Sequence, residues 1–512
     1  MTMDTLPALT FLAPLPLLAV AALAATRPGR RPGAVPKLAE GAALLSLVLA
    51  LGGVAQLVLT GPQATMLLQL DAVSATMATL VAFVGWVVSR YSRTYLDGES
   101  REGAFHALLL ATLAGVLILV QSASLITLVA AFAAVGIGLR QLLLFYPDRP
   151  EAQRAAAKFT LVWTAGDAAL AAAALLLWQA HGTADLPALA AQTTFPLTAH
   201  FAVALIVLAA ALKTAAFPLH GWLTEVMEAP TPVSALLHAG IINAGGFLLV
   251  RMADSVQQSP GAMAALVMLG GFTALFGAAV MLTQSAVKTA LAWSTVAQMG
   301  FMLLQCGLGL WALAVLHIVA HSLYKAHAFL SSGDAVRAVA SIRKPGPVAV
   351  PGLAAVAKAF ALALVVYALV ATGFGLVASP KSAQALALGA ILIFGVAYLI
   401  AQGLADAAPW ALTRRTAIAS LGAAIAYFGF HVLSAALWGP HLPKPPVAGA
   451  LEWALIVLAL LSFGLVAIAQ ALFPLWAHHP AAAGIRVHLA NGLYLNAVLD
   501  RIIGGFRTAK SH

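Results

Sequence analysis

The sequence has little charge and almost no cysteine. Only 9% of its 512 residues are charged, whereas soluble domains carry about a quarter. The single cysteine, Cys306, excludes an internal disulfide framework and any iron–sulfur or structural zinc site built on cysteines. Nucleotide-binding glycine motifs and zinc-ligand spacings are also missing, and so is any long polar stretch that could form a soluble domain. We therefore expect neither a cofactor nor a metal in this chain.

Long apolar runs are what the chain has instead. Hydrophobic residues make up 62% of it, and many runs between residues 6 and 477 reach the roughly 20 residues that a membrane-crossing helix needs. The runs are continuous, unlike the alternating strands of a barrel. The first has no basic residue before it, so we expect a span and not a cleaved signal peptide. The pattern predicts an all-α polytopic membrane protein with about fifteen spans, at 6–26, 38–59, 66–89, 103–121, 124–145, 157–180, 199–227, 232–252, 262–283, 291–309, 312–332, 353–378, 385–404, 416–437 and 450–476.

The basic residues orient these spans. With the N-terminus outside, 21 of the 27 lysines and arginines fall on the cytoplasmic side, as the positive-inside rule requires. This predicts a multi-pass protein of the bacterial inner membrane, with one transmembrane domain over 1–477 and a cytoplasmic tail over 478–512. The net charge of +10 is then explained by anionic membrane lipid, and we expect no nucleic-acid partner.

Ionisable residues inside spans are the strongest functional signal. Lys213 lies near the middle of the span 199–227, five residues before Pro218. A proline inside a helix interrupts it, and the freed carbonyls can hold water beside the lysine amine. A charge at that depth costs a few kcal/mol and persists mainly at functional positions. Asp167, in the span 157–180, is a plausible counter-charge for Lys213.

A second set of titratable residues lies in the span 312–332. His317, His321 and Lys325 are four residues apart and share one helix face, and His238 extends the set. Histidine titrates near neutral pH, so this row predicts a proton path. Other candidates are more ambiguous. Glu225 and Glu228 lie near a cytoplasmic span end, where they could be surface carboxylates. For four residues at span ends, capping or snorkelling is the simpler role: Asp71, Lys358, His431 and Glu452.

Three motifs carry a family resemblance. They are KTAAFPLHGWLTEVMEAPTPVSALLHA from residue 213, KTALAWSTVAQMG from residue 288 and HIVAHSLYKAHAFLSSG from residue 317. They resemble the antiporter-like subunits of respiratory complex I and of Mrp-type cation/proton antiporters, and the resemblance covers most of residues 40–340. It implies two pseudo-repeated halves, each with a broken helix bearing a lysine (Lys213 and Lys325). The resemblance also implies that these lysines carry protons, with His317, His321, Lys288, Glu225 and Glu228 at matching positions.

The chain departs from this family at two places. The glutamate that the family has on its fifth helix, within a Trp-Glu-Gly-Val-Gly-like motif, is replaced by Ala133 in Phe132-Ala133-Ala134-Val135-Gly136. Beyond residue 340 the helices (353–476) diverge. Lys358 is the nearest match to an outlet lysine, and it lacks the acidic neighbour expected there. Because Lys213 then needs another counter-charge, we expect it to pair with Asp167.

These departures, together with the tail from His488 to Asn496, resemble the DabB family of membrane subunits of two-component inorganic carbon transporters. The resemblance implies that this chain is a transporter subunit and not an enzyme, and that it uses an ion gradient to energise CO2/bicarbonate uptake. It also implies a cytoplasmic DabA-like partner, a zinc protein similar to β-carbonic anhydrases, which would hydrate CO2. Two alternatives remain: a proton-pumping subunit of a complex I-type redox enzyme or Mrp-type Na+/H+ antiporter, and a scaffold with relic pump residues. The residues do not distinguish H+ from Na+.

Overall fold

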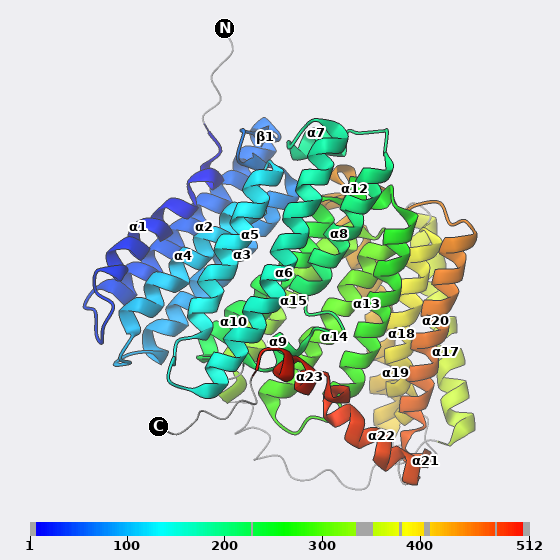
Figure 1. The fold of residues 1–512 in the computed structure, drawn as a ribbon. Coiled ribbons are helices and arrows are strands. Elements are labelled where there is room, and N and C mark those ends of the chain that lie inside the picture. The colour runs from blue at the N-terminus through cyan, green and yellow to red at the C-terminus, as the bar shows by residue number, and fades with distance from the viewer. Residues whose placement is uncertain are drawn as a thin grey trace.

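The computed structural model describes residues 7–226, 229–333, 352–377, 381–403, 410–476 and 479–504. These residues form a bundle of long helices (Figure 1). Its only strands within these ranges, β1 (Gln63–Ala64) and β2 (Gln69–Leu70), pair as a short antiparallel hairpin. The described chain is therefore all-α in architecture, as predicted.

The first part of the bundle consists of unbroken helices. After the short η1 (Leu9–Leu12) come α1 (Pro14–Ala25), α2 (Val35–Thr60), α3 (Ala72–Tyr95), α4 (Glu102–Val120), α5 (Leu125–Leu143), α6 (Pro150–His181) and the short α7 (Leu186–Ala190). Ordinary start signals fix several of them. Asp71 and Ser74 form a capping box at α3, Ser124 caps α5, and Pro150 begins α6.

Two broken spans follow. Helix α8 (Leu197–Lys213) ends at Lys213 and is followed after a gap by α9 (Gly221–Thr224). The next span consists of α10 (Thr231–Ala239), η3 (Ile241–Asn243) and α11 (Ala244–Arg251), and the short α12 (Ala253–Gln257) follows. Lys213 therefore ends its helix and does not lie midway along it. The cause is Pro218, whose ring is incompatible with a helical carbonyl at Thr214, four residues earlier.

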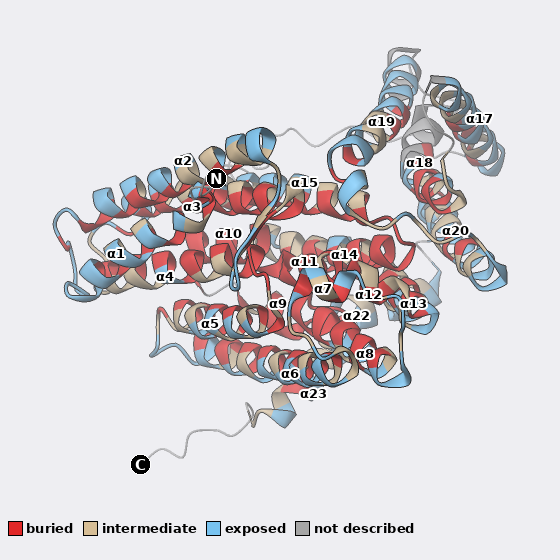
Figure 2. Ribbon diagram, turned by 90° about the horizontal axis from the view of Figure 1, so that it is seen from above, coloured by how far each residue is buried: buried red, intermediate tan, exposed pale blue. Residues whose placement is uncertain are grey.

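Three more helices complete the main bundle, and a second group stands beside it. The three are α13 (Pro260–Met281), α14 (Val287–Gly307) and α15 (Trp311–Leu330). The second group consists of α17 (Leu353–Val377), α18 (Ala383–Gly403), α19 (Trp410–Leu437), the short η4 (Gly439–His441) and α20 (Ala450–Ala471). Figure 2 shows this group apart from the other helices. Burial agrees, because most core residues of α17 and α19 form a cluster distinct from the large core of α1–α15.

The last described helices are short and run beneath the bundle in Figure 1: α21 (Phe473–Trp476), α22 (Pro480–Ala490), η5 (Gly492–Tyr494) and α23 (Leu495–Ile502). Elsewhere glycines set close helix contacts. A Cβ on Gly270 of α13 or on Gly300 of α14 would lie 2.4 Å from backbone atoms of the opposite helix. These two helices therefore cross with their backbones almost touching.

The prediction of a multi-pass membrane protein is confirmed, and the prediction of a break in the helix of Lys325 is wrong. Eleven helices of the described chain are long and apolar enough to cross a membrane, and three shorter apolar ones match the first, seventh and thirteenth predicted spans. Helix α14 corresponds to the tenth predicted span, but it is neither among the eleven long apolar helices nor among the three shorter ones. The chain is a multi-pass membrane protein. The predicted break in the helix of Lys325 is absent: α15 runs unbroken from Trp311 to Leu330, because it contains no proline or glycine.

Candidate functional site

A buried ion pair lies where α8 ends. Lys213 is fully buried, and its Nζ is 2.6 Å from Oδ1 of Asp167 on α6, whose side chain is 20% exposed. Because Lys213 occupies the last turn of α8, the negative end of the helix dipole also favours its charge. The contact expected from the sequence between these two residues is present.

Two aromatic rings complete the surroundings of Lys213. Its Nζ lies 4.0 Å from the ring centroid of Trp163 and 4.6 Å from that of Phe132, distances at which a ring face attracts a cation. Trp163 Nε1 donates to the Phe132 carbonyl at 3.2 Å. Gly136 makes room, since a Cβ there would meet Trp163 at 2.4 Å. Helix α5 thus offers a ring beside the position where the family has its glutamate, and α6 supplies the carboxylate.

The gap between α8 and α9 is stabilised by side chains. Trp222 Nε1 donates to the Leu212 carbonyl at 3.3 Å, and the Phe217 amide donates to Thr273 Oγ1 at 3.2 Å. His220 lies buried in this gap with its ring 4.8 Å from Trp293, and its Nδ1 has no hydrogen-bond partner among the described residues. Sequence reasoning did not select His220, although it belongs to the quoted motif.

A second buried lysine was missed. Lys158 of α6 is one of the 21 basic residues that the sequence analysis assigned to the cytoplasmic side, yet its side chain is fully buried. Its Nζ lies 2.6 Å from Glu225 Oε1 and 2.8 Å from Asp500 Oδ1. Glu225 is thereby brought into a polar cluster and is not a free surface carboxylate. The assignment failed because Lys158 is buried by a tail segment that is more than 300 residues away in sequence.

The second lysine of the family resemblance has different partners. Lys325 is fully buried, and its Nζ donates to the Leu291 carbonyl at 3.0 Å and to Ser294 Oγ, both on α14. Within the described residues it makes no ion pair. Tyr324 places its ring centroid 5.7 Å from the Lys325 Nζ. Lys325 is therefore surrounded by dipoles and not by an opposite charge.

Three histidines continue from Lys325. His238 is fully buried, with Nδ1 3.1 Å from Thr295 Oγ1 and its ring stacked 4.3 Å from Phe329. His321 Nε2 donates to the His238 carbonyl at 3.1 Å, and its ring centroid is 5.9 Å from that of His317. These contacts bring together His238, His321 and His317, which the sequence proposed as one set.

A cavity of about 530 Å³ opens beside this row. It lies between α14 and α15 on one side and α18 and α19 on the other, and its polar lining includes His317, His321, Gln298, Gln305 and Tyr427. His317 Nδ1 donates to Gln305 Oε1 at 2.8 Å. Its Nε2 is buried and has no partner among the described residues. This atom is thus an unused proton acceptor beside a space large enough for several waters.

The remaining predicted residues are scattered. Lys288 Nζ donates to Thr231 Oγ1 at 3.1 Å, at the start of α10. Lys358 lies exposed on α17 and joins no part of this site, and Glu228 lies outside the described residues. Glu452 Oε2 accepts from the Gly449 amide at 2.9 Å, so its predicted capping role is confirmed.

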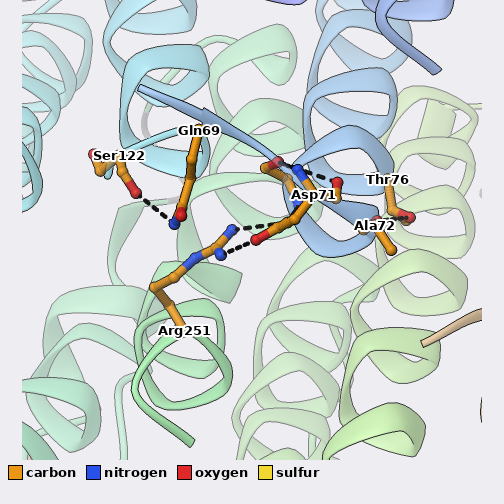
Figure 3. Close-up of polar contacts among 7 residues, drawn as sticks. Gln69, Asp71, Ala72, Thr76, Ser122 and Arg251 are labelled. Atoms are coloured by element: carbon orange, nitrogen blue, oxygen red, sulfur yellow. Dashed lines mark hydrogen bonds and ion pairs between the residues drawn. The ribbon is translucent and has the colours of Figure 1, made fainter. Parts of the chain in front are cut away.

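Asp71 combines a cap with an ion pair at the opposite end of the bundle. Its Oδ1 accepts from the Ser74 amide, and its Oδ2 lies 2.5 Å from Arg251 Nη1 at the end of α11 (Figure 3). Gln69 Nε2 donates to the Ser122 carbonyl nearby. Burial alone would raise the pKa of Asp71, but Arg251 and hydrogen bonds from Ser74 outweigh it and hold the pKa below its usual value. The predicted cap at Asp71 is confirmed.

No group of three or more potential metal ligands occurs within the described residues. The titratable groups of the site are ammonium, carboxylate and imidazole groups in an apolar surrounding. Such groups bind and release protons without any bond to carbon being made or broken. An arrangement of this kind can move ions.

Comparison with known proteins identifies similar chains. The family profile described as "NADH:quinone oxidoreductase/Mrp antiporter, TM" matches residues 122–405, and "NADH-Ubiquinone oxidoreductase (complex I), chain 5 N-terminus" matches residues 59–106. The chain is 38% identical over 450 residues to the "Probable inorganic carbon transporter subunit DabB2" of Halothiobacillus neapolitanus, covering 85% of this chain and 79% of that protein.

Further relatives match about half of each chain. The "Probable inorganic carbon transporter subunit DabB" of Hydrogenovibrio crunogenus is 44% identical over 268 residues, which are 51% of this chain and 52% of that protein. NADH-quinone oxidoreductase subunit L of Mycobacterium tuberculosis is 35% identical over 277 residues, which are 53% of this chain and 44% of that protein.

Solved structures share the fold. The Mrp complex from Dietzia sp. contains a chain that matches with a TM-score of 0.64 and 22% identity, over 97% of this chain and 59% of that one. The archaeal membrane-bound sulfane sulfur reductase matches with a TM-score of 0.60 and 18% identity, over 98% of this chain and 100% of that one. At these identities the likeness concerns the fold alone.

Proposed function

We propose that this chain moves protons across the inner membrane to energise inorganic carbon uptake. The premise is its family: the chain belongs to the NADH:quinone oxidoreductase/Mrp antiporter family and, within it, to the DabB-type inorganic carbon transporter subunits. It would act as a transporter subunit. Hydration of CO2 would take place in a cytoplasmic zinc-containing partner.

The observation that carries this proposal is the buried pair of Lys213 and Asp167 at the helix break. A buried ion pair contributes little net stability, because desolvation offsets most of the attraction between its charges. Its presence in a membrane span is more typical of a proton or ion path. A proton that reaches Asp167 would neutralise the carboxylate and leave the Lys213 ammonium without its counter-charge. Lys213 could then release its own proton to water at the freed carbonyls.

The second half supplies a continuation of the path. Lys325, His321 and His317 follow one face of α15 and end beside the 530 Å³ cavity. The unpartnered Nε2 of His317 faces no competing donor among the described residues, so it is suited to receive a proton. We propose that proton movement at Lys213 and proton movement at Lys325 are coupled, so that both halves draw on the ion gradient. In the proposed orientation the N-terminus lies outside and residues 478–512 lie in the cytoplasm.

The direct test is Lys213→Ala in the complex with its partner. We expect gradient-driven bicarbonate accumulation to be abolished while the protein still inserts and assembles, because no span is altered. Lys213→Arg should fail as well, since guanidinium stays protonated at working pH. Accumulation at the wild-type level in Lys213→Ala would refute the proton path in this half.

A protonophore tests the energy source, because hydration alone is an equilibrium process and cannot accumulate product. We expect uptake to require both subunits and to stop when the proton gradient collapses. Uptake that survives collapse of both the proton and the sodium gradients would contradict the proposal.

A second candidate is a redox-driven or sodium-coupled pump, which the match to NADH-quinone oxidoreductase subunit L favours. A redox pump would move protons outward when a quinone reductase is active, whereas the proposed subunit uses an existing gradient. Inhibition by a sodium ionophore, with resistance to a protonophore, would indicate Na+ as the coupling ion.

A further inference from the structure

The C-terminal segment folds back onto the broken span. Helix α23 packs against α6 and α9, beneath the bundle in Figure 1. Its residues Asn496 and Asp500 are four apart and share one face of the helix, and Leu499 between them is 5% exposed. The backbone of α9 is shaped for this contact, because a Cβ on Gly221 would lie 2.0 Å from Asn496 Oδ1.

The docked segment completes the cluster around Lys158. Lys158 Nζ is 2.6 Å from Glu225 Oε1, 2.8 Å from Asp500 Oδ1 and 3.2 Å from Asn496 Oδ1. Asn496 Nδ2 in turn donates to Glu225 Oε1 at 2.5 Å. The lysine is fully buried, and the Glu225 and Asp500 side chains are 30% and 17% exposed. Residues from three separate parts of the chain therefore hold one buried ammonium.

The charges of this cluster do not balance. Two carboxylates face one ammonium, so the cluster carries one excess negative charge when all three groups are ionised. Arg154, one turn earlier on α6, is the other charged group that acts on Glu225, and its side chain is 43% exposed. Asp500 Oδ1 is buried and lies 2.8 Å from Lys158 Nζ, so the other carboxylate oxygen, Oδ2, is the one that can accept a proton. A proton that binds there would remove the excess charge.

The cluster lies on the same helix as Asp167. Lys158 and Asp167 are nine positions apart on α6, about 13.5 Å along the helix axis. Phe159 and Trp163 lie between them on α6, and Trp222 of α9 contacts both rings, with centroids 5.4 Å and 6.2 Å away. The rings of Phe159, Trp163 and Trp222 thus lie between the two charged sites. Trp163 contacts Lys213 at one site, and Phe159 follows Lys158 directly in sequence at the other.

We propose that Lys158, Glu225 and Asp500 form a proton-loading site at the cytoplasmic end of the Lys213 route, and that the C-terminal helix supplies its second carboxylate. This inference rests on the proposed function. A proton from the cytoplasm binds Asp500 Oδ2, converting the carboxylate to a carboxylic acid, and leaves Lys158 paired with Glu225. Its transfer to Asp167 requires movement of the Trp163 or Trp222 ring.

The test compares Asp500→Asn and Asp500→Glu in the full complex. Asp500→Asn should lower gradient-driven proton flux in proteoliposomes about tenfold and flatten its dependence on cytoplasmic pH. Asp500→Glu should restore most of the flux, because the carboxylate returns. Asp148→Asn is the matched control: it is the same substitution at an exposed position in the loop before α6, and its flux should equal that of the wild type.

Docking of the tail is measured separately with thiol labelling. The only native cysteine, Cys306, is fully buried, so cysteines introduced by Leu499→Cys and Val498→Cys report the local exposure. We expect protection at position 499 and reactivity at position 498, whose valine is 55% exposed, with and without Asp500→Asn. Loss of flux together with exposure of position 499 would make Asp500 an anchor of the tail and overturn its role in proton loading.

The Lys213→Ala variant separates the two levels of the proposal. If Lys213→Ala abolishes flux and Asp500→Asn does not change it, the loading site is wrong and the proposed function stands. If Lys213→Ala leaves flux intact, the proposed function itself fails, whatever Asp500→Asn does.

Discussion

The two buried lysines of the motifs differ in what neutralises them. Lys213 has a carboxylate at 2.6 Å, two ring faces and a helix C-terminus. Lys325 has a backbone carbonyl, a hydroxyl and one more distant ring, that of Tyr324, and within the described chain no carboxylate contacts it. Both side chains are fully buried. A buried lysine is therefore stabilised by an opposite charge at one site and by neutral groups at the other.

Under the proposed function, this difference suits the two halves to different tasks. A charge that must leave water is stabilised far more by an opposite charge than by neutral dipoles. Lys213 is thus suited to hold a proton until Asp167 is neutralised. Lys325, which has only dipoles, is suited to a proton that is passed on at once toward His321 and His317.

Removal of the Asp167 carboxylate should have the largest effect. Asp167→Asn keeps the shape but leaves the Lys213 charge buried and unpaired, which costs roughly 3–5 kcal/mol. We expect gradient-driven uptake to fall at least about tenfold, with the protein still present in the membrane at normal levels. Quantitative blotting with bicarbonate uptake measures both. Uptake close to wild type would mean that Lys213 does not depend on this pair.

Return of the family glutamate should partly repair that loss. Ala133 stands at the position of the missing fifth-helix carboxylate, and its neighbour Phe132 already contacts Lys213. In the Asp167→Asn background, Ala133→Glu should recover uptake about threefold or more. The same glutamate in the wild-type background should not increase uptake, because Lys213 already forms an ion pair with Asp167. A double-mutant cycle in proteoliposomes measures this coupling, and strict additivity would contradict it.

A change at Lys325 should be milder, because its partners are neutral. Ser294→Ala removes the hydroxyl and leaves the Leu291 carbonyl in place, so Lys325 loses one of two hydrogen bonds and keeps the other. We expect uptake to fall by about two- to tenfold. The control is Ser285→Ala, the same change in the exposed loop before α14. Equal effects of the two substitutions would argue against a specific contact with Lys325.

Parts of this comparison could be predicted from the sequence, for a physical reason. Asp167 was found because a buried lysine needs a counter-charge and no other carboxylate lies deep in that half. The row of His317, His321 and Lys325 was found because helical spacing places them on one face. The break after Lys213 was found because Pro218 cannot continue a helix.

The remaining parts depend on tertiary structure. The burial of Lys158 requires α23 to fold back from the end of the chain, and no local pattern encodes that contact. The expected break at Lys325 was wrong because it was inferred from the symmetry of two lysines and not from a helix-breaking residue. The actual second break, between α10 and α11, adjoins Gly240, whose effect on a helix is too weak to predict from sequence alone.

The smallest effect on transport should come from the other buried ion pair, Asp71 with Arg251 at the opposite end of the bundle. Asp71→Asn is the same substitution as Asp167→Asn, and asparagine preserves the helix cap. It should lower stability by about 1–3 kcal/mol, because Arg251 loses its charged partner. Uptake per folded molecule should stay unchanged. A loss of uptake comparable to that of Asp167→Asn would remove the distinction between a functional and a structural pair.

The pH dependence of that stability follows from the sign of the pKa shift. The pKa of Asp71 is lower in the folded protein than its usual value, so the pair contributes fully above the unfolded value of about 3.9 and is lost as pH falls through the folded value. In thermal unfolding in detergent, wild type and Asp71→Asn should therefore differ by a constant amount between about pH 5 and 8 and converge only below about pH 4. Convergence near neutral pH would show that Asp71 does not hold its charge through Arg251. The ion pair would then differ from the Lys213 pair in strength and not only in task.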